Sequence, residues 1–221
     1  MNPEEALSEY VAPQFEKPLI WPQGKSAAIA YADNVFADSF CQTIIDHCLE
    51  NNDRSFRGKT MGGINLSVKS SIDWHLEHAQ DAPINKEQEL DKRIFDQLWR
   101  VIRLYQHSIP QLKDAGNVEK AAVGDSGYQV QLYKKHEGFY DEHIDGAPWI
   151  ESTRARTLGI VIYLNAVEVG GGTYFPMHNL TIDARQGRVA LFPAHWTHPH
   201  SGVMPMSGDK WIISTFINCN T

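Results

Sequence analysis

Residues 128–145, YQVQLYKKHEGFYDEHID, decide how this chain is interpreted. The first six residues alternate in the way that is typical of a β-strand with one buried face. The stretch ends at His143 and Asp145, and residues two apart in a strand lie on the same face. An imidazole and a carboxylate could therefore approach one metal ion, although a polar strand end would explain this short pattern as well.

Further β-like segments follow at residues 158–164, 189–192 and 211–217, and many short strands at such spacing predict a sandwich or a barrel. Two amphipathic helices are predicted before them. One begins at a capping box formed by Ser39 and Gln42, and the other runs from Asn85 to Ser108. Helices first and strands later indicate an α+β fold, in which the helices brace one face of a β-sandwich.

The length of 221 residues favours one domain, 1–221. We expect residues 1–120 to form an N-terminal arm and supporting helices, and residues 121–221 to form the β-rich core. The first 35 residues are not assigned a role. Hydrophobic residues make up 42% and charged residues 21%, which excludes fibrous and disordered classes.

The net charge of −7 disfavours nucleic acid as a partner, because a negative field repels phosphate. The sequence contains neither a signal-like start nor an apolar stretch of membrane-spanning length. Cys41, Cys48 and Cys219 are an odd number of thiols without a metal-type spacing, and we interpret them as packing residues. We therefore predict a cytoplasmic protein with no membrane association.

Three histidines, His195, His198 and His200, lie between two of the predicted strands. Two histidines and one carboxylate on one side of a metal leave coordination positions open, as in non-haem Fe(II) oxygenases. A structural zinc would need a fourth ligand, usually cysteine, and no cysteine lies near these histidines in the sequence. His198 and His200 share a strand face by alternation, so this pattern leaves both as candidate ligands.

Residues 128–217 resemble the 2-oxoglutarate and Fe(II)-dependent oxygenases, in particular their prolyl 4-hydroxylase-like branch. The resemblance extends over motifs at fixed spacing: Tyr133, Tyr140, His143-x-Asp145, Arg156, Tyr163-Leu164-Asn165, Gly170-Gly171-Gly172-Thr173-x-Phe175-Pro176, and His200 followed by Gly208 and Lys210. It implies a double-stranded β-helix, that is, a jelly-roll or cupin-like core.

The resemblance also implies the roles of individual residues. His143, Asp145 and His200 would bind iron, the family spacing of ten residues to Lys210 selecting His200 over His198. Lys210 would hold the distal carboxylate of 2-oxoglutarate. The hydroxyls of Tyr133 and Tyr163 would hydrogen-bond 2-oxoglutarate. Three further residues would contact the substrate: Tyr140, Arg156 and Trp149.

The implied activity is that of a dioxygenase that hydroxylates a C–H bond with release of succinate and CO2. Its cofactors would be Fe(II), 2-oxoglutarate and O2, with ascorbate as a reductant. The expected substrate is a prolyl residue in a peptide or protein. A free amino acid or another small molecule is the second choice.

Two other functions are weighed against this one. A cupin-like metal protein that is not an oxygenase could use the same fold and ligands, but Lys210, Tyr133 and Tyr163 speak against it. A nucleic-acid demethylase of the same superfamily is disfavoured by the net charge and by lysine rather than arginine after His200. The sequence predicts neither the oligomeric state nor the identity of the substrate.

Overall fold

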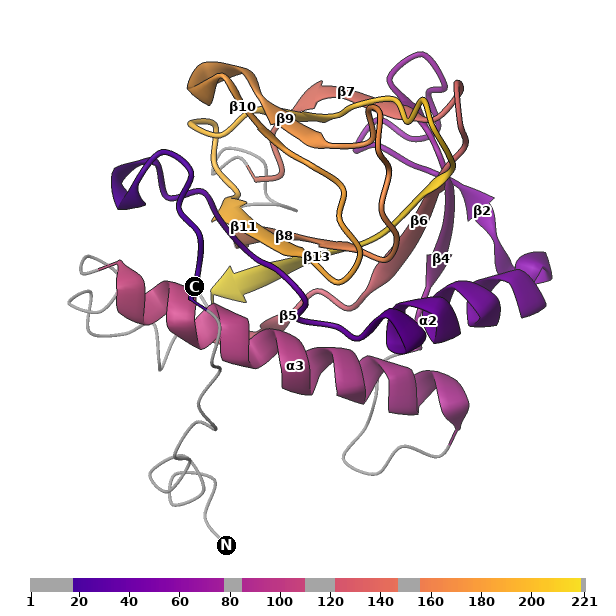
Figure 1. Cartoon of the computed structure of the whole chain (residues 1–221). Helices are drawn as coiled ribbons and strands as arrows, with labels where there is room; N and C mark the ends of the chain where they lie inside the picture. The colour runs from indigo at the N-terminus through magenta and orange to yellow at the C-terminus, as the bar shows by residue number, and fades with distance from the viewer. Residues whose placement is uncertain (1–17, 78–84, 110–121, 147–155, 220–221) are drawn as a thin grey trace, which may run out of the picture.

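The computed structural model describes residues 18–77, 85–109, 122–146 and 156–219, which form two antiparallel β-sheets and two main helices (Figure 1). The larger sheet has eight strands, and seven of them follow one another in the spatial order β1, β11, β8, β13, β6, β4 and β2, while β5 pairs with β13. Their bounds are β1 (Ala30–Ala32), β11 (Val189–Pro193), β8 (Arg156–Tyr163), β13 (Lys210–Cys219), β6 (Gln129–Tyr133), β4 (Ile72–His75), β2 (Phe56–Arg57) and β5 (Ala122–Asp125).

The smaller sheet has five strands and faces the inner side of the larger one (Figure 1). Its spatial order is β10 (Leu180–Ile182), β9 (Thr173–Phe175), β12 (His200–Gly202), β7 (Phe139–His143) and β3 (Lys69–Ser70). Three short 3-10 helices complete the described elements: η1 (Lys25–Ala27), η2 (Asn52–Arg54) and η3 (Pro176–His178). The β-strands predicted at 128–133, 158–164, 189–192 and 211–217 correspond to β6, β8, β11 and β13, which all lie in the larger sheet.

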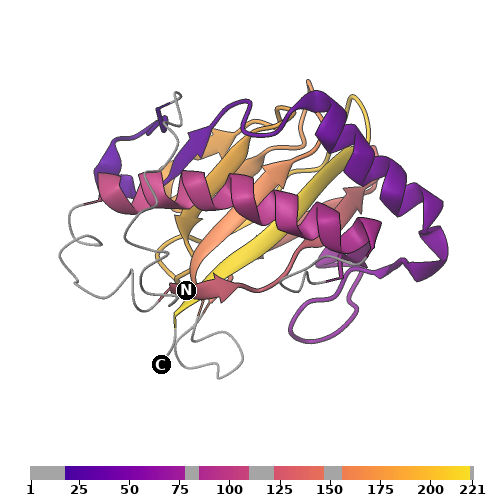
Figure 2. The ribbon, with the colours of Figure 1, turned by 90° about the horizontal axis from the view of Figure 1, so that it is seen from below.

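Helices α2 (Asp38–Glu50) and α3 (Lys86–Ser108) lie on the outer face of the larger sheet (Figure 2). Alternation in the strands separates the two faces: in β6, Val130 and Leu132 pack toward the helices, whereas Tyr133 packs between the sheets. One apolar cluster therefore joins the helices to the sheet, and a second fills the space between the sheets. The predicted α+β class, with helices bracing a double-stranded β-helix, is confirmed.

The two helices start differently. Asn85 caps α3 as predicted, because its side chain accepts a hydrogen bond from the Gln88 N–H at 2.8 Å. The predicted capping box at Ser39 and Gln42 is wrong. Helix α2 already begins at Asp38 and Ala37 precedes it, so Ser39 lies within the first turn and its carbonyl accepts from another side chain.

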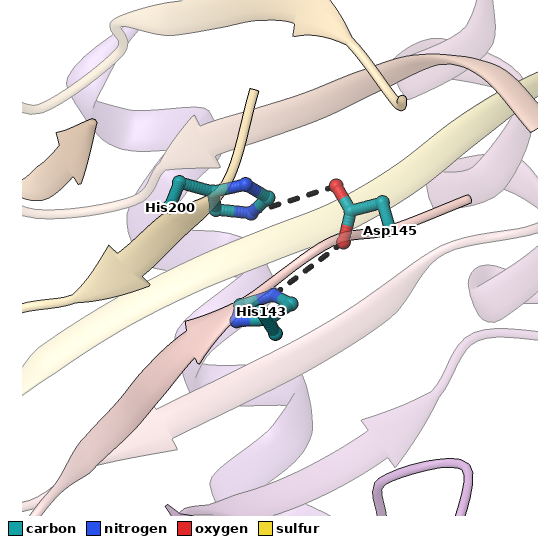
Figure 3. A group of neighbouring side chains, drawn as sticks. All are labelled: His143, Asp145 and His200. Atoms are coloured by element: carbon teal, nitrogen blue, oxygen red, sulfur yellow. Dashed lines mark ion pairs between the residues drawn. The ribbon is translucent and has the colours of Figure 1, made fainter. Parts of the chain in front are cut away.

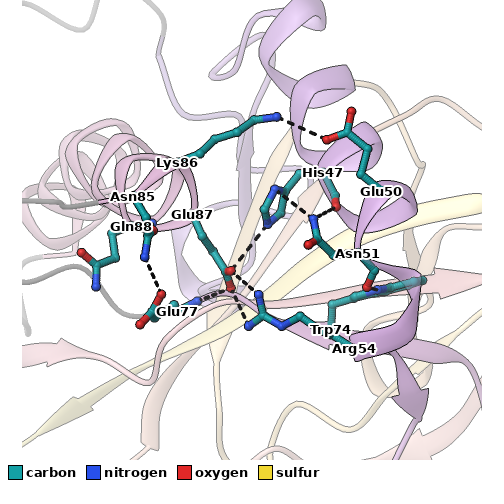
Figure 4. Close-up of polar contacts among 10 residues, drawn as sticks. All are labelled: His47, Glu50, Asn51, Arg54, Trp74, Glu77, Asn85, Lys86, Glu87 and Gln88. Atoms are coloured by element: carbon teal, nitrogen blue, oxygen red, sulfur yellow. Dashed lines mark hydrogen bonds and ion pairs between the residues drawn. The ribbon is translucent and has the colours of Figure 1, made fainter.

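A polar cluster ties the start of α3 to α2 and to the end of β4 (Figure 4). At its centre, buried Glu87 accepts hydrogen bonds from both terminal nitrogens of Arg54, at 2.5 and 3.3 Å, and from the backbone N–H of Glu77 at 2.6 Å. His47 Nε2 lies 3.7 Å from the same carboxylate. Burial opposes ionisation of Glu87, but these donors outweigh it and lower its pKa.

The thiols of Cys41 and Cys48 are buried and unpaired, and both face the helix side of the core. Burial raises their pKa values to about 11 and about 12, so neither thiol is ionised near neutral pH. This agrees with a packing role for these two residues. The side chain of Cys219 lies outside the described part of the structure.

Candidate active site

The two strands that carry the predicted histidines are neighbours in the smaller sheet. His143 is the last residue of β7, His200 is the first residue of β12, and the two are paired directly across the strands. Asp145 follows β7 by two residues, and its carboxylate faces both imidazoles (Figure 3). Its carboxylate oxygens are 3.5 Å from Nε2 of His143 and 3.5 Å from Nε2 of His200.

One ligand atom from each of these three residues lies within 4.8 Å of the other two. In both histidines the other ring nitrogen is held by a backbone carbonyl. His143 Nδ1 lies 2.8 Å from the Asp141 carbonyl, and His200 Nδ1 lies 3.1 Å from the His198 carbonyl. A carbonyl can only accept, so each Nδ1 carries the proton and each Nε2 presents a lone pair.

The electrostatics of this group suit a cation. Burial, the largest influence, lowers the pKa of His200 to about 4, so its ring is neutral at physiological pH. Burial opposes ionisation of Asp145, but the neighbouring imidazoles of His200 and His143 outweigh it and lower its pKa. Two imidazoles and one carboxylate that converge on one point are the donor set that fits Fe(II).

A glycine on the larger sheet makes room for the carboxylate. A Cβ at Gly159 in β8 would lie 2.7 Å from Asp145 Oδ2 and 2.6 Å from the ring of Phe192. Arg156 at the start of the same strand donates to the Asp145 carbonyl at 3.0 Å. The orientation of Asp145 is thus fixed from β8 as well as from its own segment.

His198 lies apart from this group. Its Nε2 is 2.8 Å from the Ala27 carbonyl, its Nδ1 is 2.9 Å from the Thr197 hydroxyl, and its ring stacks on that of His178. Both ring nitrogens are therefore engaged elsewhere. The structure brings His143, Asp145 and His200 together and does not bring His198 to them.

A cavity of about 310 Å³ opens beside the three residues, between the two sheets. Lys210, the first residue of β13, lines it and is only 1% exposed. In the described part of the chain no carboxylate forms an ion pair with this ammonium, which lies 4.4 Å from the centre of the Tyr133 ring. Burial lowers the pKa of Lys210 to about 7. A buried cation without a counter-charge fits a carboxylate of a bound dianion.

Asn165 holds Lys210 in place. Its side-chain oxygen accepts from the Trp211 N–H at 2.7 Å, and its amide nitrogen donates to the Asp209 carbonyl at 2.8 Å. The residues on both sides of Lys210 are thereby bound to the end of β8. The sequence placed Asn165 within a family motif, and the structure gives it this physical role.

The two tyrosines expected near 2-oxoglutarate are placed differently. Tyr133 lines the cavity and donates its hydroxyl proton to Gln131 Oε1 at 2.7 Å. Tyr163 is fully buried and does not line the cavity; its hydroxyl lies 2.6 Å from Thr173 Oγ1 and 3.2 Å from the Ile182 carbonyl. Thr173, which the sequence offered only as part of a glycine-rich motif, lies at the cavity in its place.

Tyr140 and Arg156, which the resemblance placed toward the substrate, both line the cavity. The Tyr140 ring stacks on His143, and the Arg156 guanidinium lies 3.9 Å from the Phe216 ring centroid. Trp149 lies outside the described residues. Sequence reasoning missed Lys69, Gln129, Gln131 and Ser214 of the lining, because polar side chains at alternate strand positions also occur on solvent-exposed faces.

The glycine-rich motif forms a tight connection before β9. Gly170 has a φ of +74°, and a Cβ there would lie 2.1 Å from the Met204 carbonyl oxygen. Only glycine combines this conformation with so close an approach. The segment after β12 is thereby packed against the start of β9, next to the strand that carries His200.

The family comparison matches residues 128–218 to the 2OG-Fe(II) oxygenase superfamily. These residues belong to that superfamily. They contain all three residues of the candidate metal group and Lys210, so the enzyme class and the cofactors Fe(II) and 2-oxoglutarate agree with the expectation from the sequence.

Similar proteins extend the likeness of this oxygenase beyond the matched region. A protein of Acanthamoeba polyphaga mimivirus that is named as a prolyl 4-hydroxylase is 26% identical over 196 residues, 81% of this chain and 69% of the relative. A prolyl hydroxylase of Trichoplax adhaerens, solved with a peptide fragment of the oxygen degradation domain of hypoxia inducible factor, has a TM-score of 0.68 at 17% identity. That alignment covers 88% of this chain and 84% of the other.

The viral collagen prolyl hydroxylase of Paramecium Bursaria Chlorella virus-1, solved as a 2OG complex, has a TM-score of 0.61 at 18% identity, covering 87% of this chain and 97% of that one. At such identities the two solved structures establish the shared fold. No helix among the described residues combines the length and the apolar character that crossing a membrane requires.

Proposed function

We propose that His143, Asp145 and His200 bind Fe(II), that Lys210 binds the distal carboxylate of 2-oxoglutarate, and that the oxygenase hydroxylates a prolyl residue in a peptide. One observation carries the proposal: a group of three metal-binding side chains and an unpaired, fully buried lysine line the same cavity. A metal protein without a dicarboxylate co-substrate would have no use for that buried charge.

The chain's own residues account for the binding steps. The Asp141 and His198 carbonyls keep the lone pairs of both imidazoles directed at the metal. Three protein ligands on one side leave further coordination positions for the co-substrate and O2. When bound, Fe(II) and 2-oxoglutarate supply the oxidising chemistry of the superfamily.

Lys210 supplies the charge that fixes the dicarboxylate end, and the buried walls of the cavity limit the access of water to it. Thr173 and Tyr133 line the same cavity and can hydrogen-bond the bound anion through their hydroxyls. Because the Tyr133 proton already goes to Gln131, the chain must redirect this proton before Tyr133 can donate to the anion.

The choice of a peptide substrate is supported by two residues that line the cavity and by the similar proteins. Tyr140 and Arg156 line the cavity beside the metal group, and a hydroxyl and a guanidinium suit a peptide carbonyl as hydrogen-bond donors. The solved structures that share the fold are named as prolyl hydroxylases, and one of them contains a peptide fragment.

The decisive experiment is an anaerobic titration with Fe(II) and 2-oxoglutarate that follows the visible charge-transfer band of a chelated keto acid. A band that needs both additions and is absent in His143→Ala supports the proposal. His198→Ala is the matched control, because this histidine lies outside the metal group and should leave the band intact. Metal binding without the band would overturn the proposed co-substrate site.

Substrate choice is tested separately with the metal-loaded enzyme. Proline-containing peptides and free proline are incubated with 2-oxoglutarate and O2, and mass spectrometry looks for the gain of one oxygen atom. Oxygen gained on a peptide prolyl residue supports the proposal. Oxygen gained only on free proline would replace the peptide with a small-molecule substrate.

A further inference from the structure

A buried ion pair joins the two sheets at the edge of the cavity. Lys69 belongs to β3 in the smaller sheet and Asp73 to β4 in the larger one, so the chain passes from sheet to sheet between them. Lys69 Nζ lies 3.0 Å from Asp73 Oδ2, and Gln129 Nε2 donates to the same oxygen at 2.7 Å. Both charged side chains are almost completely buried, and buried pairs of this kind seldom add net stability.

The ammonium of Lys69 also faces the tyrosine that stacks on a candidate iron ligand. Strands β3 and β7 pair so that Lys69 stands opposite Tyr140, and Lys69 Nζ lies 5.2 Å from the centre of the Tyr140 ring. That ring stacks on His143 with 3.6 Å between centroids and an interplanar angle of 15°. A continuous series of contacts therefore runs from Asp73 through Lys69 and Tyr140 to His143.

The backbone of Gly58 packs against the buried pair. A Cβ at Gly58 would lie 2.1 Å from Ser71 Oγ, 3.0 Å from Lys69 Cε and 3.1 Å from Asp73 Oδ2, so the backbone of Gly58 packs closely against both members of the pair. A desolvated cation is attracted to an aromatic face more strongly than an exposed one. The position of the ammonium is therefore set by Asp73 and by packing, and the ammonium in turn constrains the ring.

We propose that Lys69, held by Asp73, is a positioning residue that keeps the Tyr140 ring against His143 and so fixes the orientation of this imidazole toward the metal. The inference rests on the proposed function, in which His143 binds iron. It assigns the buried pair a role in metal affinity rather than in folding alone.

The test measures the affinity of the purified protein for Co(II), used as an air-stable probe, from its visible absorption and by calorimetry. Lys69→Met/Asp73→Asn removes both charges together and leaves no unpaired buried ion. We expect its Co(II) dissociation constant to rise about tenfold, as when a group supporting a metal ligand is lost. Tyr140→Ala should show a similar loss, and Tyr140→Phe, which keeps the ring, should bind like wild type.

The combined variant decides whether Lys69 acts through Tyr140. If it does, adding Tyr140→Ala to the double variant causes no further loss, since the two changes interrupt one series of contacts. Losses that multiply would overturn the proposal. A folded double variant with wild-type affinity, checked by its unfolding transition, would overturn it too.

Two further measurements separate a failure of the proposed iron site from a failure of the positioning role of Lys69. If the double variant does not fold, Asp73→Asn keeps the shape of this side chain and removes the counter-charge that holds Lys69, and unchanged Co(II) affinity in this variant contradicts the proposal. A wild-type protein that binds no Co(II) overturns the proposed iron site and this inference with it. Wild-type binding together with unaffected variants overturns the inference alone.

Discussion

Lys210→Met should make the ligand-free protein more stable and abolish its co-substrate site. The substitution keeps an unbranched side chain of similar length and removes the buried charge. Burial lowers the pKa of Lys210 from 10.5 to about 7, and at about 1.4 kcal/mol for each pKa unit this corresponds to about 5 kcal/mol. The protonated lysine costs the folded protein roughly this much at pH 7 and below.

The dependence on pH follows from where the proton is bound. Between about pH 7 and 10.5 the unfolded chain holds a proton on Lys210 and the folded chain does not, so the stability of the wild type rises with pH over this range. Lys210→Met lacks this dependence. Its advantage in free energy of unfolding is expected to be largest at pH 7 and below, and to vanish near pH 10.5.

Binding of 2-oxoglutarate should show the opposite trend. The bound carboxylate needs the protonated lysine, so wild-type affinity should fall about tenfold for each pH unit above about 7. Calorimetry of the Co(II)-loaded protein in buffers of different ionisation enthalpy should detect the proton taken up.

Denaturant titrations at several pH values measure the stability part. Lys92→Met replaces an exposed lysine that is paired with Asp96 on α3 and is the matched control. It should change neither the free energy of unfolding nor the affinity for 2-oxoglutarate. Lower stability of Lys210→Met at pH 7, or an affinity for 2-oxoglutarate that is flat from pH 7 to 9, would refute the reasoning from the buried charge.

Three other substitutions test separate parts of the structure. Gly159→Ala should weaken metal binding by displacing the Asp145 carboxylate, measured by Co(II) titration; unchanged affinity would show that the carboxylate is not confined from β8. Glu87→Gln should cost about 1–3 kcal/mol of unfolding free energy at pH 7, because Arg54 loses its charged acceptor. Because the pKa of Glu87 is lowered by folding, this stabilisation is present above the unfolded pKa of about 4.5 and is lost as the pH falls through the folded value. If wild type and Glu87→Gln still differ by the same free energy of unfolding at acid pH, the stabilising role of the Glu87 carboxylate is contradicted. Asn165→Ala should raise the requirement for 2-oxoglutarate and leave Co(II) affinity unchanged; equal loss of both would indicate a general effect on the fold.

Four strands of the larger sheet, β6, β8, β11 and β13, could be predicted from the sequence because they are long or continuously apolar, whereas its other four strands have only two to four residues and were not predicted. β8 and β11 appear as uninterrupted hydrophobic runs, since one face meets the helices and the other meets the smaller sheet. The strands of the smaller sheet are short and partly polar. β12 has three residues, His200–Gly202, and β3 has two, so neither produces a period that a sequence pattern could detect.

Only part of the metal group has a local signal in the sequence, and the choice of His200 over His198 came from the family spacing to Lys210. His143 and Asp145 are two residues apart, and His200 pairs with His143 across adjacent strands. The contacts of Tyr163 could not be predicted in this way. Whether its hydroxyl points to the cavity or to Thr173 depends on side-chain packing between the sheets, which no spacing encodes.

The charge inside the cavity differs in sign from the net charge of the chain, because the fold brings several cations together there. The chain carries a net charge of −7, yet the described residues that line the cavity include four cations and one carboxylate. The cations are Lys59, Lys69, Arg156 and Lys210, and the carboxylate is Asp145. Lys69 already has a counter-charge in Asp73, and Asp145 is offered to the metal. A dianionic co-substrate therefore meets a locally positive cavity inside a negatively charged protein, so net charge constrains the partners of the outer surface and not the ligands of the site.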